Sequence, residues 1–551
     1  MIYSSVASSL TKIINDMPPV IDKACLNLTA LKGDSLSFQV IYFSDTDIKG
    51  KIFVRSDLGK AVTVRSVEYV PVSVISADPV HLSDFGYISN KPFRCPDVLR
   101  KMRGNKLSLK AGKYRTVLVD IELPVNVKTG EHTVSVILSD TDGSELCRND
   151  QKITVLDAVL PESSLIHTEW FHTDCIADYY GYEVFSEKHW KAIESFMKTA
   201  VRRRINMILT PVFTPPLDTD VGCERTTVQL VDVYVRDGKY SFGFEKLDRW
   251  IDLALKCGYK YFEISHFFTQ WGANAAPKIM ANVDGTYKRI FGWDTPVSEG
   301  VYPQFLSVFL PALTDFLRNK GIADRCYFHV SDEPSKAHLE NYVRAKNIIK
   351  PYLQGFKTFD ALSNYEFYST GAVEIPVPAS NHIVPFIENG VPNLWTYYCV
   401  SQGYKTSNRF LSMPLVRTRA IGVQMFKFRI HGFLQWGYNF YNTRLSKQHL
   451  DPYKAVAPEL SFPTGDAYIV YPGAGGKAEE SLRLLAFNAA LTDLSAMNAL
   501  AKKTSYDYVL QLAEDGLNSP ITFENYPLSE LYYVNLRNRV NRELEKQKEG
   551  K

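Results

Sequence analysis

The 551-residue sequence has no uninterrupted run of about 18 apolar residues, which is the length that a membrane-spanning helix needs. We therefore expect no membrane insertion. The first twenty residues, MIYSSVASSLTKIINDMPPV, also lack a basic start followed by an unbroken apolar stretch, so no secretory signal is visible. These two absences predict a cytoplasmic protein, or a secreted one if a leader segment precedes this sequence.

Closely spaced metal-binding and disulfide motifs are missing as well. The eight cysteines are scattered, and no two of them form a C-x-x-C pair, so the spacing fits neither a zinc site nor a small disulfide scaffold. It predicts buried free thiols, as in a reducing cytoplasm. His172, His266, His329 and His431 show no H-E-x-x-H or similar spacing. We therefore expect no metal and no other cofactor.

A strong excess of charge of one sign is also lacking. The chain has 63 basic and 60 acidic residues, a net charge of +3, which argues against a nucleic-acid partner. No G-x-S-x-G elbow is present, which weakens a serine hydrolase interpretation. In PGAGGKAEE (472–480), Tyr471 and Ala478 replace the glycine and the hydroxyl residue of a phosphate loop, so a flexible loop is the better interpretation.

Aromatic residues are abundant, at 13% of the chain with 32 Tyr, 31 Phe and 7 Trp. Sugar-binding clefts use aromatic faces, but a large core uses them too, so this composition only favours a carbohydrate partner. A chain of this length exceeds one core and predicts several domains. The sequence leaves the oligomeric state open.

Residues 1–162 predict an N-terminal β-sandwich domain. Short runs of alternating or β-branched residues recur, such as LSFQVIYFS, AVTVRSVEYVPVSVIS and GEHTVSVILSD, and turn signals such as DTDIKG and KTGE separate them.

Residues 165–505 change to alternating strands and helices and predict a TIM-like (β/α)8 catalytic barrel, followed by a C-terminal helical extension at 506–551. The fold class is therefore multidomain α/β. An inserted hairpin is expected at 226–243. The RRR run at 202–204 closes an expected helix, where cations complement the helix dipole. The eight expected strands are 167–175, 205–213, 260–267, 325–333, 355–363, 372–380, 393–400 and 432–440.

Two adjacent carboxylates, Asp332 and Glu333, end the fourth expected strand in RCYFHVSDEPS (325–335). Pro334 cannot continue a central strand, so the pair lies at a strand tip, where side chains of a βα-barrel carry out catalysis. The alternative is that both residues only favour the N-terminal dipole of the following helix. The neighbouring His329 and aromatic residues favour chemistry, and we expect Asp332 and Glu333 to be catalytic.

Polar and aromatic residues also gather at the ends of the other strands. Gln, Asn, Asp and His side chains bind sugar hydroxyls, and several Trp residues that converge in one barrel favour a sugar platform over core packing. The expected substrate-binding residues are His172, Asp174, His266, Gln270, Trp271, Asp360, Trp395, Tyr397, Tyr398, Trp436 and Asn439.

A protein nucleophile opposite the acidic pair is missing from the expected strand ends. Retaining barrels often place it at the end of the seventh strand, but NLWTYYCVSQ contains no carboxylate, and neither does QWGYN on the eighth. Consecutive side chains cannot easily flank one bond as acid and nucleophile. They can serve as an acid and as an orienting group for a nucleophile that belongs to the substrate.

Seven motifs in order, EWFHTDC, ILTPVFTPPLD, FEISHFFTQWGA, HVSDEP, LWTYYC, GFLQWGYNFYN and GDAYIVYPG, resemble those of the glycoside hydrolase family 123 β-N-acetylgalactosaminidases. They also resemble uncharacterised-domain proteins that share this catalytic barrel. The resemblance covers about residues 165–505 and is weaker in the sandwich.

The resemblance implies exo-hydrolysis of terminal β-linked N-acetylgalactosamine (GalNAc) from glycans or glycolipids, with retention and substrate-assisted catalysis. It implies that Asp332 orients the 2-acetamido group and stabilises the oxazolinium intermediate, and that Glu333 is the general acid and then the base. A strand-end tyrosine that binds the acetamide carbonyl maps to Tyr397 or Tyr398. Strand alternation allows only one of them to face the site.

Two alternatives remain at this stage. The protein could be a β-N-acetylhexosaminidase of another specificity, such as β-N-acetylglucosamine (GlcNAc), or a non-catalytic carbohydrate-binding protein. An intact acidic pair argues against the binder, since a binding protein has no need of a general acid.

Overall fold

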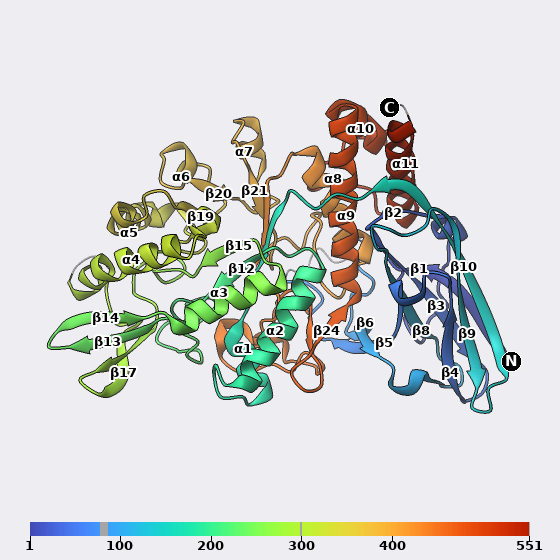
Figure 1. Cartoon of the computed structure of the whole chain (residues 1–551), viewed down its shortest axis with the longest axis horizontal. Helices are drawn as coiled ribbons and strands as arrows, with labels where there is room; N and C mark the ends of the chain where they lie inside the picture. The colour runs from blue at the N-terminus through green and yellow to red at the C-terminus, as the bar shows by residue number, and fades with distance from the viewer. Residues whose placement is uncertain (78–85, 298–299, 550–551) are drawn as a thin grey trace.

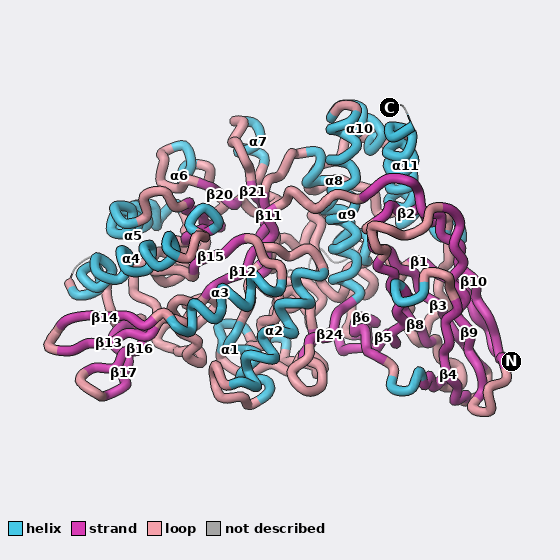
Figure 2. The backbone as a smooth tube through the Cα atoms, viewed as in Figure 1, coloured by secondary structure: helices cyan, strands magenta, loops and turns pink. Residues whose placement is uncertain are grey.

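The computed structural model describes residues 1–77, 86–297 and 300–549. Two β-sheets lie at the right of Figure 1, a barrel of parallel strands and helices occupies the centre and left, and the long helix α9 stands between them. Figure 2 shows the same division, with strands gathered at the right and helices around the barrel. Both chain termini lie on the sandwich side.

The N-terminal part confirms the expected β-sandwich. The first sheet has the order β1 (Ile2–Ser8), β3 (Ser35–Ser44), β8 (Arg115–Glu122), β5 (Val62–Val72), β6 (Phe93–Lys101), β24 (Ala478–Ser481) and β23 (Tyr471–Pro472). The second has the order β2 (Leu28–Lys32), β10 (Glu145–Val159), β9 (Gly130–Asp140), β4 (Ile48–Arg55) and β7 (Lys106–Leu109).

Strand β8 shows why this sequence forms a covered sheet. Val117, Val119 and Ile121 belong to the core between the two sheets. Leu118 belongs to the large core shared with the barrel. Because successive side chains of a strand point to opposite faces, β8 buries one face against the second sheet and the other toward the barrel.

The barrel confirms the expected eight parallel strands. Their order is β11 (Ile166–Glu169), β12 (Met207–Thr210), β15 (Tyr261–Ile264), β18 (Cys326–Phe328), β19 (Lys357–Ala361), β20 (Ile375–Val377), β21 (Trp395–Tyr397) and β22 (Gly432–Gln435), and β22 pairs with β11. The gap between β20 and β21 is bridged by Tyr397, whose N–H donates to the Pro378 carbonyl at 3.1 Å. The acidic pair follows β18, the fourth strand.

The helices cover the outside of the barrel and continue onto the sandwich (Figure 1). They are α1 (Thr173–Tyr180), α2 (Glu187–Arg202), α3 (Glu245–Cys257), α4 (Val301–Asn319), α5 (Leu339–Ile349), α6 (Glu366–Ser369), α7 (Val384–Glu388), α8 (Leu415–Lys427), α9 (Leu482–Lys503), α10 (Tyr506–Glu514) and α11 (Glu530–Glu549).

The first barrel strand is shorter than expected. The sequence predicted a strand over 167–175, but β11 ends at Glu169 and α1 already begins at Thr173. Asp174 lies in the first turn of α1, where a carboxylate complements the helix dipole, and Gly181 ends the helix in the left-handed conformation. Helix-terminus chemistry therefore outweighed the β preference of EWFHTDC.

The expected hairpin at 226–243 is present as β13 (Asp232–Arg236) and β14 (Lys239–Gly243). A second hairpin, which the sequence did not predict, is formed by β16 (Ile279–Val283) and β17 (Thr286–Phe291). Strand β16 pairs with β13, so the two hairpins join into one small sheet at the left of Figure 1.

The barrel and the sandwich form one packed unit. Strand β24 leaves the barrel and pairs with β6 of the sandwich. Helix α11 packs on the second sheet, where Asn538 accepts the Thr29 N–H at 3.0 Å and Arg537 pairs with Asp34 at 2.5 Å. The C-terminal helices therefore hold both parts together.

Among the described residues, α9 is the one helix that is long and apolar enough to span a membrane by length and composition alone. Its most apolar window is 78% buried inside the protein. All eight cysteines are free, and Cys25, Cys95, Cys175 and Cys326 are buried.

Candidate active site

A cavity of about 680 Å³ opens at the carboxyl ends of the barrel strands. Among the residues that line it are six expected site residues: Gln270, Trp271, Asp332, Glu333, Tyr397 and Trp436. The lining also contains residues that sequence reasoning did not single out, among them Val74, Ser76, Ala77, Asp218, Ser401, Arg444, Leu445 and Phe462.

The acidic pair reaches this cavity because of one backbone conformation. Successive residues of an extended strand point to opposite faces, which would send Asp332 and Glu333 apart. Glu333 instead has φ +43°, in the left-handed region that few residues other than glycine adopt. Its N–H donates to the Ala361 carbonyl at 3.1 Å, and the Asp332 carbonyl accepts the Trp271 N–H at 3.0 Å. Both carboxyl groups therefore line one cavity.

The Glu333 carboxylate has a defined partner. The Tyr397 hydroxyl donates to Glu333 Oε1 at 2.5 Å. Burial, and then the Glu333 charge, raises the pKa of Tyr397 well above its ordinary value, so this hydroxyl keeps its proton. A tyrosine at the end of the seventh strand thus faces the acid at the end of the fourth, across the mouth of the barrel.

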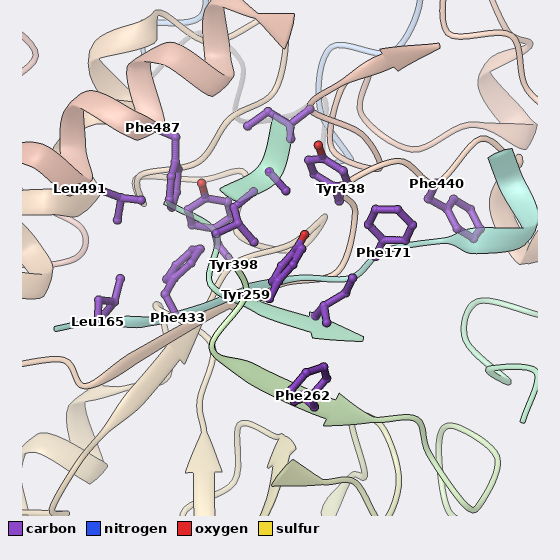
Figure 3. Packing of buried hydrophobic residues seen from close by; sticks show 14 of the residues in the cluster. Leu165, Phe171, Tyr259, Phe262, Tyr398, Phe433, Tyr438, Phe440, Phe487 and Leu491 are labelled. Atoms are coloured by element: carbon purple, nitrogen blue, oxygen red, sulfur yellow. The ribbon is translucent and has the colours of Figure 1, made fainter. Parts of the chain in front are cut away.

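The two neighbouring tyrosines point in opposite directions. Tyr397 lines the cavity, whereas Tyr398 is fully buried with its ring 5.1 Å from that of Phe433. Figure 3 shows Tyr398 among the packed side chains, near Phe433 and Phe487. Strand alternation left open which of the two tyrosines points to the cavity. The position of the strand in the barrel makes it Tyr397.

Asp332, like Glu333, is partly buried in the cavity wall. Burial, and then the neighbouring Glu333 carboxylate, raises the pKa of Asp332 well above its ordinary value, while His329 acts in the opposite direction. Within the described residues, the Asp332 carboxylate makes no hydrogen bond to the protein. Its oxygens are therefore free to accept hydrogen bonds from a ligand.

Beneath Asp332 lies a buried charged network. His329 Nε2 is hydrogen-bonded to Glu263 Oε1 at 2.6 Å, and His329 Nδ1 is hydrogen-bonded to Asp360 Oδ1 at 2.8 Å. Burial lowers the pKa of His329, but the hydrogen bonds with Asp360 and Glu263 outweigh it and raise the pKa to about 9. His329 is therefore an imidazolium at neutral pH, and its positive charge acts to lower the pKa of Asp332. The Tyr342 hydroxyl donates to the second oxygen of Asp360 at 2.5 Å.

The same network does not have the character of a metal site. His266, His329 and Asp360 place three potential ligand atoms within 4.8 Å of one another. Both ring nitrogens of His329, however, donate to carboxylates, and an imidazolium has no lone pair for a metal. The ring of His266 stacks on that of His329 at 4.0 Å, and burial lowers its pKa well below the ordinary value.

Seven of the expected substrate-binding residues do not line the cavity: His172, Asp174, His266, Asp360, Trp395, Tyr398 and Asn439. Their contact with a sugar stays a prediction, and the structure places them behind the cavity lining or away from it. Their polar groups are engaged with other parts of the protein, or their rings are packed in its core.

His172, Asp174 and Asn439 join the first and eighth strand ends. Asp174 forms a buried ion pair with Arg225 at 2.7 Å. His172 Nε2 lies 2.8 Å from the Trp436 carbonyl, and Asn439 bonds to the backbone of His172 through both its amide oxygen and nitrogen. The sequence placed these residues correctly near the strand ends but could not show that they face one another.

Trp395 lies inside the barrel. It is 1% exposed, and its ring lies 5.3 Å from that of Phe359. Gly432 on the next strand leaves room for the indole, because a Cβ at that position would come within 2.1 Å of the Trp395 ring. Trp395 is therefore a core residue.

Asp218 is the carboxyl group in the cavity that sequence reasoning missed. It follows β12, has φ +41°, and accepts the Leu445 N–H at 2.9 Å through Oδ2, while its own N–H donates to Gln270 at 2.6 Å. Burial raises its pKa to about 6, and Arg444 acts in the opposite direction. The motif ILTPVFTPPLD contains this residue, but the loop hides its position from any strand pattern.

The family model described as glycoside hydrolase 123, catalytic domain, matches residues 170–500. No curated protein sequence matches the chain. Among solved structures, a family 123 glycoside hydrolase from Clostridium perfringens, studied for glycolipid glycan hydrolysis, is 15% identical, with a TM-score of 0.74 over 100% of this chain and 99% of that one. At 15% identity, this similarity shows that the two chains share a fold.

Two other similarities are much weaker. A β-glucuronidase from Parabacteroides merdae is 10% identical over 89% of this chain and 51% of its own, with a TM-score of 0.33. A termite-gut GH10 xylanase with a bacterial Ig-like domain is 10% identical over 86% of this chain and 100% of its own, also with a TM-score of 0.33. At these TM-scores, neither similarity supports a conclusion about this protein.

Proposed function

The chain belongs to glycoside hydrolase family 123, and within that family we propose that it is an exo-acting, retaining β-N-acetylgalactosaminidase that removes terminal β-GalNAc from glycans or glycolipids. The observation that carries this proposal is that Asp332 and Glu333, consecutive in the chain, both line one cavity. An acid and an orienting carboxylate side by side suit a reaction in which the substrate supplies its own nucleophile.

Glu333 is proposed as the general acid and base. It is held by the Tyr397 hydroxyl and lies between buried and exposed, so it can reach a glycosidic oxygen. In the first step its proton goes to the leaving oxygen as the bond to the anomeric carbon breaks. In the second step Glu333 takes a proton from water, which attacks the anomeric carbon and restores the acetamide.

The nucleophile is proposed to be the acetamide oxygen of the substrate, with Asp332 working on it. An intramolecular nucleophile gains an effective molarity of up to about 10⁵–10⁸ M when it is well oriented. The Asp332 carboxylate has no protein hydrogen-bond partner in the described part of the chain, so it can accept the acetamide N–H and stabilise the oxazolinium charge. A substrate N–H would lower the pKa of Asp332 from its raised value.

The remaining cavity residues are proposed to position the sugar. Trp271, 42% exposed, and Trp436 offer aromatic faces to its C–H bonds. Asp218 and Gln270 offer oxygen and nitrogen atoms to its hydroxyl groups. Tyr397 would pass its hydrogen bond from Glu333 to the acetamide carbonyl when substrate enters, which would free Glu333 for the leaving group.

A panel of four aryl β-glycosides tests this function: GalNAc, GlcNAc, galactose and glucose. We expect hydrolysis of the GalNAc glycoside without added metal or nucleotide, retention of the β configuration in the first-formed product by NMR, and inhibition by a GalNAc-thiazoline. The plain galactoside lacks the acetamide and should be inert. Efficient galactoside cleavage, an α product, or activity lost with EDTA and restored by a divalent ion would overturn the proposal.

The same panel separates the alternatives. A GlcNAc glycoside cleaved faster than the GalNAc glycoside would indicate a β-N-acetylhexosaminidase of the other specificity. Binding of the sugars without turnover of any glycoside would indicate a carbohydrate-binding protein.

Asp332→Asn provides an internal control on the mechanism. It should lose most activity even on an activated aryl substrate, because an amide cannot stabilise the oxazolinium charge as a carboxylate does. An Asp332→Asn variant with wild-type turnover would rule out this role for Asp332.

A further inference from the structure

A buried carboxyl group lies behind one wall of the active-site cavity. Asp466 is 0% exposed and is not among the residues that line the cavity. Its Oδ2 accepts the indole N–H of Trp436 at 3.0 Å, and Trp436, which is half-buried, does line the cavity. The motif GDAYIVYPG contains Asp466, and the proposed mechanism does not use it.

This carboxyl group has few other partners, although burying one without partners is costly. Arg409 lies near enough to act on its charge but pairs with Glu169 at 2.8 Å. The other oxygen of Asp466, Oδ1, has Gln435 Nε2 at 3.5 Å. Burial raises the pKa of Asp466 to about 7, while Arg409 and the Trp436 hydrogen bond act in the opposite direction. The indole N–H is therefore the main donor that this group serves.

The backbone of Asp466 is held against the segment that carries Trp436. The Asp466 carbonyl accepts Gln435 Nε2 at 3.2 Å, and Gln435 directly precedes Trp436. On the other side of Trp436, a Cβ at Gly437 would come within 2.5 Å of the Ala467 backbone, so glycine permits the two backbones to approach this closely. Asp466 is therefore a fixed point against which the indole can be oriented.

Two phenylalanines pack against the ring of Trp436 without setting its orientation. The ring centroids of Phe440 and Phe462 lie 5.1 Å and 4.8 Å from that of Trp436, at interplanar angles of 60° and 62°. These contacts constrain the tilt of the indole, but they offer no carbonyl or carboxylate oxygen for its nitrogen edge. The hydrogen bond to Asp466 turns that edge toward a residue outside the cavity lining.

We infer that Asp466 is a positioning residue that orients Trp436 so that the carbon surface of the indole, and not its N–H, meets the C–H face of the sugar. The inference rests on the proposed function, in which Trp436 binds the GalNAc ring. An indole N–H that lost its buried acceptor would turn toward another one, in a sugar hydroxyl or in water, because an unpaired buried donor is costly. Asp466 acts through Trp436 and does not itself touch the substrate.

Steady-state kinetics on an aryl β-GalNAc glycoside test this role. Asp466→Ala and Asp466→Leu remove the acceptor and should raise KM by about fivefold or more. They should change kcat by less than about twofold, because the lost interaction concerns sugar binding. Asp466→Asn also removes the charge, which acts on Glu333, but keeps an oxygen for the indole N–H, so its KM should stay near the wild-type value. Thermal unfolding shows whether each variant is folded.

A double-mutant cycle connects the effect to the indole N–H. Trp436→Phe keeps an aromatic ring but has no N–H, so adding Asp466→Ala to it should raise KM no further. The matched control is Asp178→Ala, because Asp178 is a carboxyl group 14% exposed that accepts the Thr226 hydroxyl at 2.8 Å and does not line the cavity. This control should leave KM unchanged.

Each result decides the positioning role. A KM that rises with Asp466→Ala or Asp466→Leu alone, and not in the Trp436→Phe background, supports it. An unchanged KM in a folded variant, a rise that persists with Trp436→Phe, or an equal rise with Asp466→Asn or with Asp178→Ala overturns it. If neither Asp466→Ala nor Asp466→Leu folds, Asp466 acts on the fold and the inference fails.

The proposed glycosidase activity is tested separately from these variants. It fails only if the wild-type protein cleaves no GalNAc glycoside, and the positioning role then fails with it. Every other outcome overturns or supports the role of Asp466 while leaving the proposed activity intact.

Discussion

At the scale of single residues, the backbone of Glu333 decides how the acidic pair works. A left-handed residue before a proline is disfavoured, because proline restricts the conformation of the residue that precedes it. The protein nevertheless holds φ at +43°, with the Glu333 N–H bonded to Ala361. Strained positions of this kind persist only where the surrounding structure fixes them, and they often occur at active sites.

The Glu333→Gln variant should lose about 10²–10⁴-fold in kcat on a GalNAc disaccharide, because the leaving oxygen loses its proton donor. The loss should be smaller on an aryl glycoside whose leaving group needs little protonation, and sugar binding should remain measurable. The measurement is steady-state kinetics on both substrates. A variant that keeps the wild-type rate on the disaccharide would show that Glu333 is not the acid.

His329 predicts a pH dependence of stability. Its folded pKa is raised from 6.5 to about 9, so the stabilisation that the protonated ring provides is fully present below about pH 6.5 and is lost as the pH rises through about 9. The Tm of the wild-type protein should therefore fall across this interval, measured by thermal unfolding in a series of buffers at constant ionic strength.

The His329→Gln variant should unfold with a free energy about 3–5 kcal/mol lower, because it leaves buried carboxylates without their cation. Asp360, whose pKa burial already raises, would then favour its protonated form more strongly, so the fall in Tm should begin at lower pH. His382→Gln, at an exposed position, is the control and should retain the wild-type profile. An unchanged profile in His329→Gln would refute the imidazolium assignment.

At the scale of elements, strands β21 and β22 show how two tryptophans from one sequence pattern acquire different roles. Trp395 lies within β21 and fills the barrel interior above Gly432, whereas Trp436 follows the last residue of β22 and lines the cavity. The difference is a matter of where each strand ends. Trp395, at the start of its strand, packs inside the barrel, whereas Tyr397 at the end of β21 and Trp436 just beyond β22 line the cavity.

Replacing these tryptophans should separate stability from activity. Trp395→Ala should lower the free energy of unfolding by about 3–5 kcal/mol, because a large buried ring is lost from the barrel core. Trp271→Ala, at a side chain 42% exposed, should leave the Tm about unchanged and raise KM for GalNAc substrates. Thermal unfolding and kinetics on both variants provide the comparison. An early-melting Trp271→Ala with a normal KM would make Trp271 a structural residue instead.

At the scale of the whole molecule, a buried ion cluster joins the sandwich to the barrel. Arg203 donates to Asp120 of β8 and to Glu480 of β24, both at 2.5 Å, and Arg65 of β5 pairs with the same two carboxylates. The sequence suggested that the RRR run only complements the dipole of its helix. The structure corrects this, because Arg203 is 1% exposed and neutralises charges on both parts.

The Arg203→Met variant should therefore destabilise the protein by about 3–5 kcal/mol, since it leaves buried carboxylates short of a cation. Arg249→Met is the matched control, because the Arg249–Glu187 pair is exposed and such pairs contribute about 0–1 kcal/mol. Denaturant unfolding followed by fluorescence measures both. If the two variants are equally stable, the cluster does not hold the sandwich to the barrel.

The sequence by itself determined the order of elements, the sandwich followed by an eight-stranded barrel, and the location of the acidic pair after the fourth strand. These features follow from local periodicity, turn residues and proline, which act over a few residues at a time. The family resemblance narrowed the acetamide-binding tyrosine to Tyr397 or Tyr398, and strand alternation, which is a local rule, allowed only one of them to face the site.

Only the tertiary structure decided which strand-end residues share the cavity. Asp218 lies on an irregular loop, where the sequence has no hydrophobic periodicity from which its position could be predicted. Its contacts with Gln270 and Leu445 bring together three separate loops. Asp174, by contrast, lies near the end of an expected strand as a site residue would. Its carboxylate is instead paired with Arg225, 51 positions away in the sequence. The contribution of Val74 to the cavity arises from the packing of one domain on another. Such contacts between residues distant in the chain are set by the packing of the whole molecule, which no local pattern records.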